Sequence, residues 1–251
     1  MAEGYAAYPS LAGRTVFITG GASGIGATMV EAFHVQGAKV AFIDIDAAAG
    51  EALAGRLDGA WFQRVDVTDA EALKGAVEQA AGALGPVTVL INNVANDTRH
   101  RAAETTPEAW RKGLAVNLDP TFIASTAAYP MMQAAGGGTI INFSSINALL
   151  GSAEMATYVA AKGAVNALTK ALAREWGPDN IRVNAISPGW VVTPRQLELW
   201  LTPEAEAEWM KLVALKRRIQ PQDVARLALF LAADDSAMIT GQNLVIDGGR
   251  T

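Results

Sequence analysis

The sequence lacks several features that define whole classes of protein. It contains no cysteine, which excludes disulfide bonds, thiolate metal ligands and cysteine nucleophiles. It has no long basic cluster and a net charge of −5, which argues against nucleic acid as a partner. No uninterrupted apolar run reaches the ~18 residues that a membrane span needs, and Met1–Tyr5 lacks the charged and apolar parts of a signal peptide. We therefore expect a soluble cytoplasmic protein with no membrane partner and no metal site.

The chain does have enough apolar sequence for a large core, because 51% of its 251 residues are hydrophobic and only 18% are charged. Short apolar runs predict strands at 14–19, 38–44, 60–66, 87–92, 138–144, 181–187 and 242–247. Helical patterns lie at 24–36, 47–57, 69–84, 107–134, 155–177 and 221–233. Such alternation indicates right-handed βαβ units. We expect one α/β domain, 1–251, with a three-layer, doubly wound Rossmann fold around a seven-stranded parallel sheet.

A glycine-rich segment, residues 19–26, follows the first predicted strand and precedes a predicted helix. Strand, glycine turn and helix in this order are typical of a dinucleotide-binding site. The glycines let the backbone approach a pyrophosphate, which then lies at the positive end of the helix. Asp44 ends the second predicted strand, where a carboxylate binds ribose hydroxyls and repels a 2′-phosphate. The predicted cofactor is NAD, with NADP less favoured, and the predicted contacts are Gly20, Ser23, Gly24, Ile25, Gly26 and Asp44.

A candidate catalytic set lies in the second half of the chain and consists of Ser145, Tyr158 and Lys162. Tyr158 and Lys162 are four positions apart and therefore share one face of a helix. A free phenol has a pKa of about 10, so its use as a base near pH 7 requires a lower pKa. An adjacent positive charge favours the phenolate. We expect Lys162 to lower the pKa of Tyr158 in this way.

These motifs resemble the short-chain dehydrogenase/reductase family, and the resemblance covers nearly the whole chain. Further landmarks stand in the family's order: Asp66-Val67, Asn92-Asn93, Asn117, Pro188-Gly189, Thr193 and Asp247-Gly248-Gly249. The resemblance implies hydride transfer between a substrate carbon and C4 of nicotinamide. It implies that Tyr158 takes the hydroxyl proton, that Ser145 stabilises the same oxygen, and that Lys162 also holds the nicotinamide ribose.

The resemblance also assigns residues around this catalytic set. Asn117 would take part in a water-linked proton relay from Lys162 to solvent. Asp66, Val67 and Asn93 should line the cofactor cleft, while Val191 and Thr193 should meet the carboxamide and the phosphates. A homotetramer is expected, with helices 107–134 and 155–177 forming one interface.

Two positions depart from the family pattern, since Ala95 and Ala148 replace common glycines. A φ angle above zero would be strained at Ala95. Either the backbone there is ordinary or the loop has shifted slightly. Both changes could reshape the floor of the pocket.

The segment at about 190–219 interrupts the alternation, and by resemblance it is a small helical lid over the substrate. It contains Trp190, Trp200 and Trp209, and Thr202-Pro203-Glu204 predicts the start of a helix. Trp190 is expected to face the pocket. We interpret Trp200 and Trp209 as residues that pack the lid onto the body.

Polar side chains surround the expected position of the substrate carbon. Asn96, Asn147 and Glu154 are the predicted substrate contacts, together with Ser145, Tyr158 and Trp190. Converging amides and carboxylates suit a polyhydroxylated ligand, because its hydroxyls need partners once they leave water. Whether Asp97 and His100 also contact substrate stays open.

The stretches around 96–100 and 195–204 also resemble bacterial D-xylose and L-arabinose 1-dehydrogenases. No Lys or Arg occurs between Lys112 and Lys162, which weighs against an acidic carrier protein as substrate. The predicted function is NAD-dependent oxidation of an aldose at C1 to its lactone. The alternatives are a 3-oxoacyl or small-ketone reductase of the same fold and a non-catalytic NAD-binding regulator.

Overall fold

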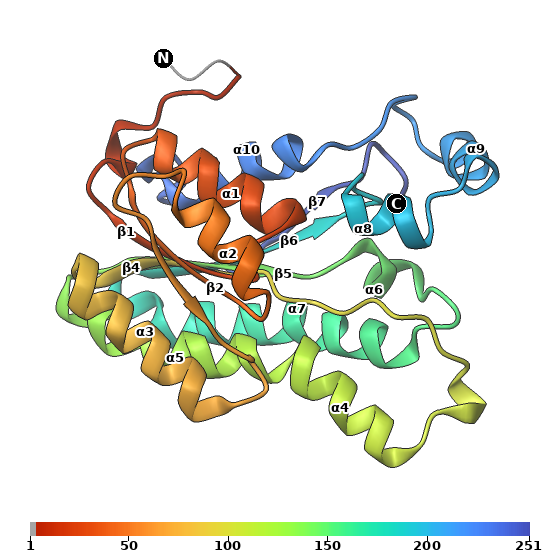
Figure 1. The fold of residues 1–251 in the computed structure, drawn as a ribbon, viewed down its shortest axis with the longest axis horizontal. Helices are drawn as coiled ribbons and strands as arrows, with labels where there is room; N and C mark the ends of the chain where they lie inside the picture. Colours follow the sequence, from red (N-terminus) through yellow and green to blue (C-terminus); the bar gives the residue numbers. More distant parts are fainter. Residues whose placement is uncertain (1–3) are drawn as a thin grey trace.

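Seven strands form one parallel sheet in the order β3-β2-β1-β4-β5-β6-β7 in the computed structural model, which describes residues 4–251 (Figure 1). The strands are β1 (Thr15–Thr19), β2 (Lys39–Asp44), β3 (Trp61–Arg64), β4 (Val87–Asn92), β5 (Gly138–Phe143), β6 (Ile181–Pro188) and β7 (Asn243–Ile246). The predicted seven-stranded parallel sheet is confirmed. The N-terminal segment Met1–Tyr5, in which no signal peptide is expected, lies partly outside the described residues, since Met1–Glu3 are not among them.

Helices cover both faces of this sheet, so the molecule has the predicted three layers (Figure 1). One face carries α1 (Gly24–Val35), α2 (Ala47–Ala54) and α10 (Pro221–Ala232). The other face carries α3 (Ala70–Leu84), α4 (Pro107–Asn117), α5 (Asp119–Ala134) and α7 (Ala156–Trp176). Short 3₁₀ helices occupy Pro9–Leu11, Ala102–Glu104, Gly177–Asp179 and Asp234–Ser236. No helix within residues 4–251 is long and apolar enough to cross a lipid bilayer.

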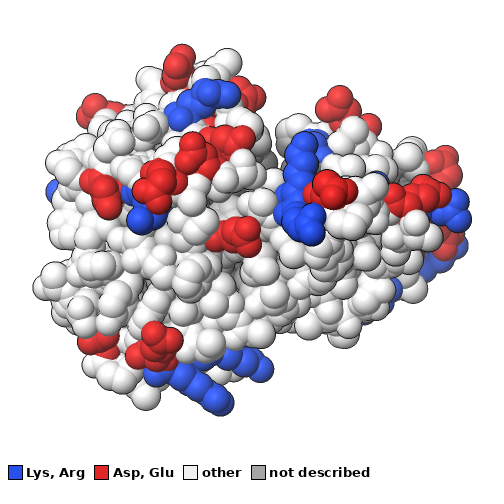
Figure 2. Space-filling model, turned by 90° about the horizontal axis from the view of Figure 1, so that it is seen from below, with Lys and Arg blue, Asp and Glu red and all other residues white. Residues whose placement is uncertain are grey.

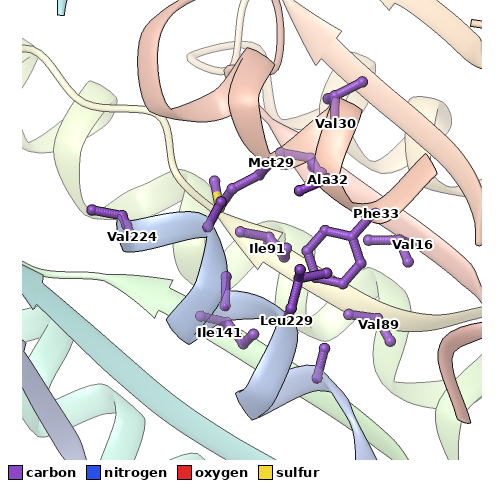
Figure 3. Packing of buried hydrophobic residues seen from close by; sticks show 14 of the residues in the cluster. Val16, Met29, Val30, Ala32, Phe33, Val89, Ile91, Ile141, Val224 and Leu229 are labelled. Carbon is purple, nitrogen blue, oxygen red and sulfur yellow. The ribbon is translucent and has the colours of Figure 1, made fainter. Parts of the chain in front are cut away.

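The packing of α1 against α10 illustrates how apolar residues hold these layers together. Met29 and Phe33 of α1 point toward Leu229 of α10 and toward the strands below, and all three side chains are fully buried (Figure 3). Burying a side chain of this size contributes about 1.5–3 kcal/mol to stability. The strands are continuous apolar runs because helices cover them on both sides.

The strand order reverses beside β1, which pairs with β2 on one side and with β4 on the other. In open parallel sheets, ligands bind beyond the carboxyl ends of the strands at such a reversal. The segments that follow β1, β2, β4 and β5 all leave the sheet at this edge. The fold therefore brings the glycine turn, Asp44, the 93–100 loop and Ser145 to one place.

The lid comprises α8 (Pro194–Leu199), α9 (Pro203–Leu212) and their flanking segments, beyond the carboxyl edge of the sheet (Figure 1). The predicted helix start is confirmed, because Thr202 is the N-cap of α9 and its hydroxyl accepts from Ala205 N at 3.2 Å. The two stems of the lid pair with each other through a bridge between Val191 and Ile219, where Val192 N donates to Ile219 O at 2.9 Å.

One helical expectation is corrected, and one short helix was not expected. The single helix expected at 107–134 is two helices, because the chain turns at Leu118 (φ −128°, ψ −56°) between α4 and α5. Pro120 has no N–H to continue the ladder of α4. The short helix α6 (Ile146–Leu150) was not predicted; Ser145 Oγ caps it by accepting from Asn147 N at 3.1 Å. Ala95 does not have a positive φ, so the backbone there is ordinary.

Candidate active site

A cavity of about 1270 Å³ opens at the carboxyl edge of the sheet, beneath the lid. Most of the predicted cofactor and substrate residues line it. They are Gly20, Ser23, Gly24, Ile25, Gly26, Asp44, Asp66, Val67, Asn93, Asn96, Ser145, Asn147, Tyr158, Lys162, Trp190, Val191 and Thr193. Asn117 and Glu154 are the predicted site residues that do not line it.

The glycine turn brings its own backbone into very close contact. A Cβ atom added to Gly26 would lie 1.8 Å from the carbonyl oxygen of Gly20, so no other residue fits there. Gly20 itself has a φ of 67°, a conformation that favours glycine. Asn93 Nδ2 donates to Gly20 O at 3.0 Å and fixes the turn to the end of β4. The N-terminus of α1 is thus held open toward the cavity, as a bound pyrophosphate requires.

The N-terminus of α1 and the end of β2 offer polar groups to a nucleotide. Ser23 is the N-cap of α1, yet its hydroxyl makes no cap hydrogen bond and lies on the cavity wall. Asp44 accepts from Ala22 N at 3.0 Å and from Asp46 N at 3.1 Å, so its carboxylate is held in place at the cavity wall. These groups fit the phosphates and the adenosine ribose of a dinucleotide.

Ser145, Tyr158 and Lys162 line the same cavity. Burial raises the pKa of Tyr158 to about 12, while a hydrogen bond from Ser145 acts in the other direction. Lys162 Nζ donates to Phe143 O at 2.7 Å and lies 5.7 Å from the centre of the Tyr158 ring. Burial lowers the pKa of Lys162 to about 8.

The lowering of the Tyr158 pKa by Lys162 stays a prediction, since Lys162 is not hydrogen-bonded to the phenol in this structure. The ammonium group bonds to a backbone carbonyl instead of the phenol, and burial opposes the charged form of both side chains. In this arrangement Ser145 is the residue that favours the phenolate.

Asn117 is the last residue of α4 and is buried. It does not line the cavity but contacts Asn96, which does. Its Nδ2 donates to Asn96 O at 3.1 Å and to Gly113 O at 3.0 Å, and its Oδ1 accepts from Asn96 N at 2.8 Å. Both amide donors are thus occupied, and Oδ1 keeps a second acceptor site for water. Asn117 holds the 96–100 loop, and its part in a proton relay stays a prediction.

The predicted substrate residues differ in how open they are to a ligand. Asn147 lines the cavity, but its Oδ1 accepts from Ser152 Oγ at 2.8 Å. Asn96 Oδ1 accepts from the Thr98 hydroxyl at 2.6 Å, which leaves its amide nitrogen for a ligand.

The position of Glu154 is a correction to the sequence prediction. As expected it precedes α7, but it has a φ of 59°, is exposed and does not reach the cavity wall. His100 also lies off the wall, because its Nδ1 bonds Thr98 O and its Nε2 bonds Thr157.

Other wall residues were not predicted as contacts. Trp209 lines the cavity and packs edge-on against Trp190, with ring centres 5.8 Å apart, so it does more than attach the lid. Trp200 does not line the cavity, and the guanidinium of Arg99 stacks on its ring at 4.6 Å. Asp97, Arg195 and Gln196 also lie on the wall. Asp97 contacts Arg195 and Gln196, which are 98 and 99 positions away in the sequence. No local sequence pattern predicts a contact across that separation.

Comparisons with known proteins show the family of the chain and several similar relatives. A family model described as enoyl-(acyl carrier protein) reductase matches residues 20–251. The chain is 46% identical to the probable galactose dehydrogenase of Rhizobium meliloti, covering 96% of both chains. It is 44% identical to the D-xylose 1-dehydrogenase of Caulobacter vibrioides, covering 97% of this chain and 98% of that one. It is 39% identical to a galactitol 2-dehydrogenase of Cereibacter sphaeroides, covering 96% of both chains.

Proposed function

Because the chain belongs to the short-chain dehydrogenase/reductase family, whose members use NAD or NADP, we propose that it oxidises a free aldose at C1 with NAD. The product is the sugar lactone. The observation that carries the proposal is a wall of polar side chains beside Ser145 and Tyr158, in a chain whose similar relatives are named as sugar dehydrogenases.

The residues of this chain fit the parts of a nicotinamide dinucleotide. The glycine turn, with Ser23 and the N-terminus of α1, would hold the pyrophosphate, and Asp44 would hold the adenosine ribose. Lys162, Asn93, Val191 and Thr193 line the same cavity, where Lys162 would hold the nicotinamide ribose, and Val191 and Thr193 would meet the carboxamide and the phosphates. When bound, the cofactor supplies the acceptor for the hydride that leaves C1.

The residues on the substrate side carry the proton chemistry. Tyr158 takes the proton of the anomeric hydroxyl, and Ser145 donates a hydrogen bond that favours the phenolate. Asn96 and Asn147 lie where ring hydroxyls need partners, and Trp190 offers a flat apolar surface for a sugar ring. A hydroxyl missing from the ligand would leave one of these polar groups buried without a partner, so 2-deoxy sugars should be poor substrates.

The substrate is proposed to be a pentose such as L-arabinose or D-xylose, or a related hexose. D-galactose and L-arabinose share their configuration at C2, C3 and C4, whereas D-xylose and D-glucose share the other configuration at C4. NADH formation from these four sugars therefore reports in one panel both the effect of the hydroxymethyl group at C5 and the preference at C4.

The same panel should include galactitol, acetoacetyl thioesters and simple ketones, followed as NADH formation or consumption. Activity confined to the thioesters or ketones would replace the sugar assignment with the reductase alternative. Activity confined to galactitol would assign a polyol dehydrogenase. No turnover of any of these compounds by a protein that binds NAD would favour the non-catalytic regulator.

The proposed assembly is a homotetramer in the cytoplasm, built partly through α4, α5 and α7. Phe122 on α5 is 51% exposed, and Trp110 on α4 is 38% exposed. Figure 2 shows a broad surface without charged side chains on the face seen from below, the side on which α3, α4 and α5 lie in Figure 1. The exposed apolar side chains of Phe122 and Trp110 support association with further copies of the chain.

A further inference from the structure

Asp97 is an acidic side chain on the wall of the cavity, close to the reacting groups. It follows β4 in the loop that Asn117 holds, and its side chain is 25% exposed. Its negative charge also contributes to the raised pKa of Tyr158, so the carboxylate acts electrostatically on the catalytic phenol. A bound sugar beside Tyr158 would therefore lie in the field of Asp97.

Two lid residues hold this carboxylate. Gln196 Nε2 donates to Asp97 Oδ2 at 2.7 Å, and Arg195 Nε donates to Asp97 Oδ1 at the longer distance of 3.5 Å. The other end of the same amide, Gln196 Oε1, accepts from Trp190 Nε1 at 2.7 Å. One glutamine thus joins the loop after β4 to the tryptophan on the substrate side of the lid.

The contacts of Asp97 leave room for a ligand. A carboxylate has about four acceptor sites, and the lid side chains account for one short and one long hydrogen bond. Arg195 is 53% exposed, so water screens the charge that it offers to Asp97. The remaining acceptor sites suit the hydroxyl donors of a neutral sugar. A ligand anion at the same place would meet a like charge inside a partly desolvated cavity.

We propose that Asp97 determines specificity in this site by accepting a hydroxyl hydrogen bond from a neutral sugar and repelling anionic analogues. Gln196 is the positioning residue that holds Asp97 and Trp190 in place when the lid covers the site. This inference rests on the proposed function. It adds a role for Asp97 and a preference for neutral over anionic sugars, which aldose oxidation alone does not require.

The test uses Asp97→Asn, which keeps the shape of the side chain and removes its charge. Each neutral hexose is compared with its uronic acid, D-galactose with D-galacturonate and D-glucose with D-glucuronate, as substrate or as competitive inhibitor. We expect the preference for the neutral sugar, taken as the ratio of kcat/KM values or of inhibition constants, to fall at least tenfold. KM for the neutral sugar should rise severalfold, and the dissociation constant for NAD should not change. The matched control is Glu208→Gln, an exposed acid on lid helix α9 that pairs with Lys211 and should leave all these values unchanged.

A second variant tests the positioning role without altering the charge. Gln196→Ala should raise KM for the aldose at least fivefold and change kcat much less, and it should lower the same neutral-to-anionic ratio. A ratio within twofold of the wild type in Asp97→Asn would overturn the proposal, and an unchanged KM in Gln196→Ala would overturn the positioning role. A wild type that oxidises no aldose would instead overturn the proposed function, a result obtained before any variant is compared.

Discussion

Tyr158 and Lys162 are ionisable side chains in an environment that favours neither charge. Burial raises the pKa of Tyr158 to about 12 and lowers the pKa of Lys162 to about 8. Perturbed groups of this kind in a cavity are typical of catalytic sites. We propose that both residues act in catalysis. Single substitutions distinguish an effect on proton transfer from an effect on the stability of the fold.

Tyr158→Phe should lower kcat for aldose oxidation by a factor of about 10²–10⁴, because the proton-transfer group is lost while the ring remains. The dissociation constant for NAD, measured by fluorescence titration, should stay nearly unchanged. Retention of more than about a tenth of the wild-type kcat would show that Tyr158 is not the base, since a general base contributes more than that.

The buried lysine should also make stability depend on pH. Because the pKa of Lys162 is about 8 in the folded protein and 10.5 for the ordinary side chain, the unfolded chain holds a proton between these values that the folded chain has lost. The free energy of unfolding should therefore rise with pH in this window, by about 2 kcal/mol between pH 8 and pH 10. Tyr158 has a raised pKa and acts in the opposite direction only above pH 10.

Urea unfolding of the wild type and of Lys162→Met at pH 7.5, 9 and 10 measures this effect. The difference between the two proteins should grow with pH in favour of the wild type, because the methionine variant lacks the titrating group. A difference that is constant with pH would mean that Lys162 stays charged in the folded protein.

Asp44 bears on the choice between the two dinucleotides. Asp44→Ala should narrow the preference for NAD over NADP, because the variant no longer presents a carboxylate to the 2′-phosphate. The preference is measured as the ratio of kcat/KM values for the two cofactors. Equal values in the wild type would show that the loop around Asp44 moves aside.

At the scale of elements, the turn between β1 and α1 depends on the absence of a side chain. Gly26→Ala should raise the dissociation constant for NAD at least about tenfold, because its Cβ would lie 1.8 Å from Gly20 O and the turn would have to open. Gly82→Ala in α3 is the matched control, since Gly82 is exposed and no atom lies within 4 Å of its added Cβ. The control should bind NAD normally and gain about 0.5–1 kcal/mol of stability. Equal NAD affinity in both variants would contradict this role for the turn.

The elements themselves were largely predictable from the sequence, because helices on both sides require buried strands to be continuous apolar runs. The break at Leu118 was missed, since the apolar pattern continues across it and only Pro120 signals the change. The helix α6 was missed because it is a single short turn, set by the Ser145 cap and ended by Gly151 in the left-handed region.

The site was predictable where it depends on local motifs and less so where it depends on contacts across the chain. The glycine turn, Asp44, Ser145, Tyr158 and Lys162 lie together because each is fixed at the end of a strand or within a helix. The position of Glu154 depends on where α7 begins, which spacing alone places only to within a few residues. The contact between Asp97 and Gln196 depends on how the lid folds back, and no local pattern encodes that.

The whole molecule should be an oligomer. Sedimentation velocity should give a single species near four times the 26.2 kDa chain mass. Phe122→Glu should shift this species toward smaller assemblies, because a charge on an apolar interface is costly to desolvate. Glu208→Gln is a suitable control, as it lies outside the three helices proposed for the interface. A single species near 26.2 kDa in the wild type would remove the tetramer from the proposal.

The paired stems of the lid have a consequence for how this protein can change. Since Val191 and Ile219 lie side by side, the chain between them leaves the body and returns to it at one place. Lengthening such a segment adds little closure entropy and leaves the sheet and the glycine turn as they are. The lid is in effect an exchangeable cassette. Replacing the part of it beyond Thr193 would change the wall of the cavity on the substrate side and leave the glycine turn, Asp44 and Tyr158 in place.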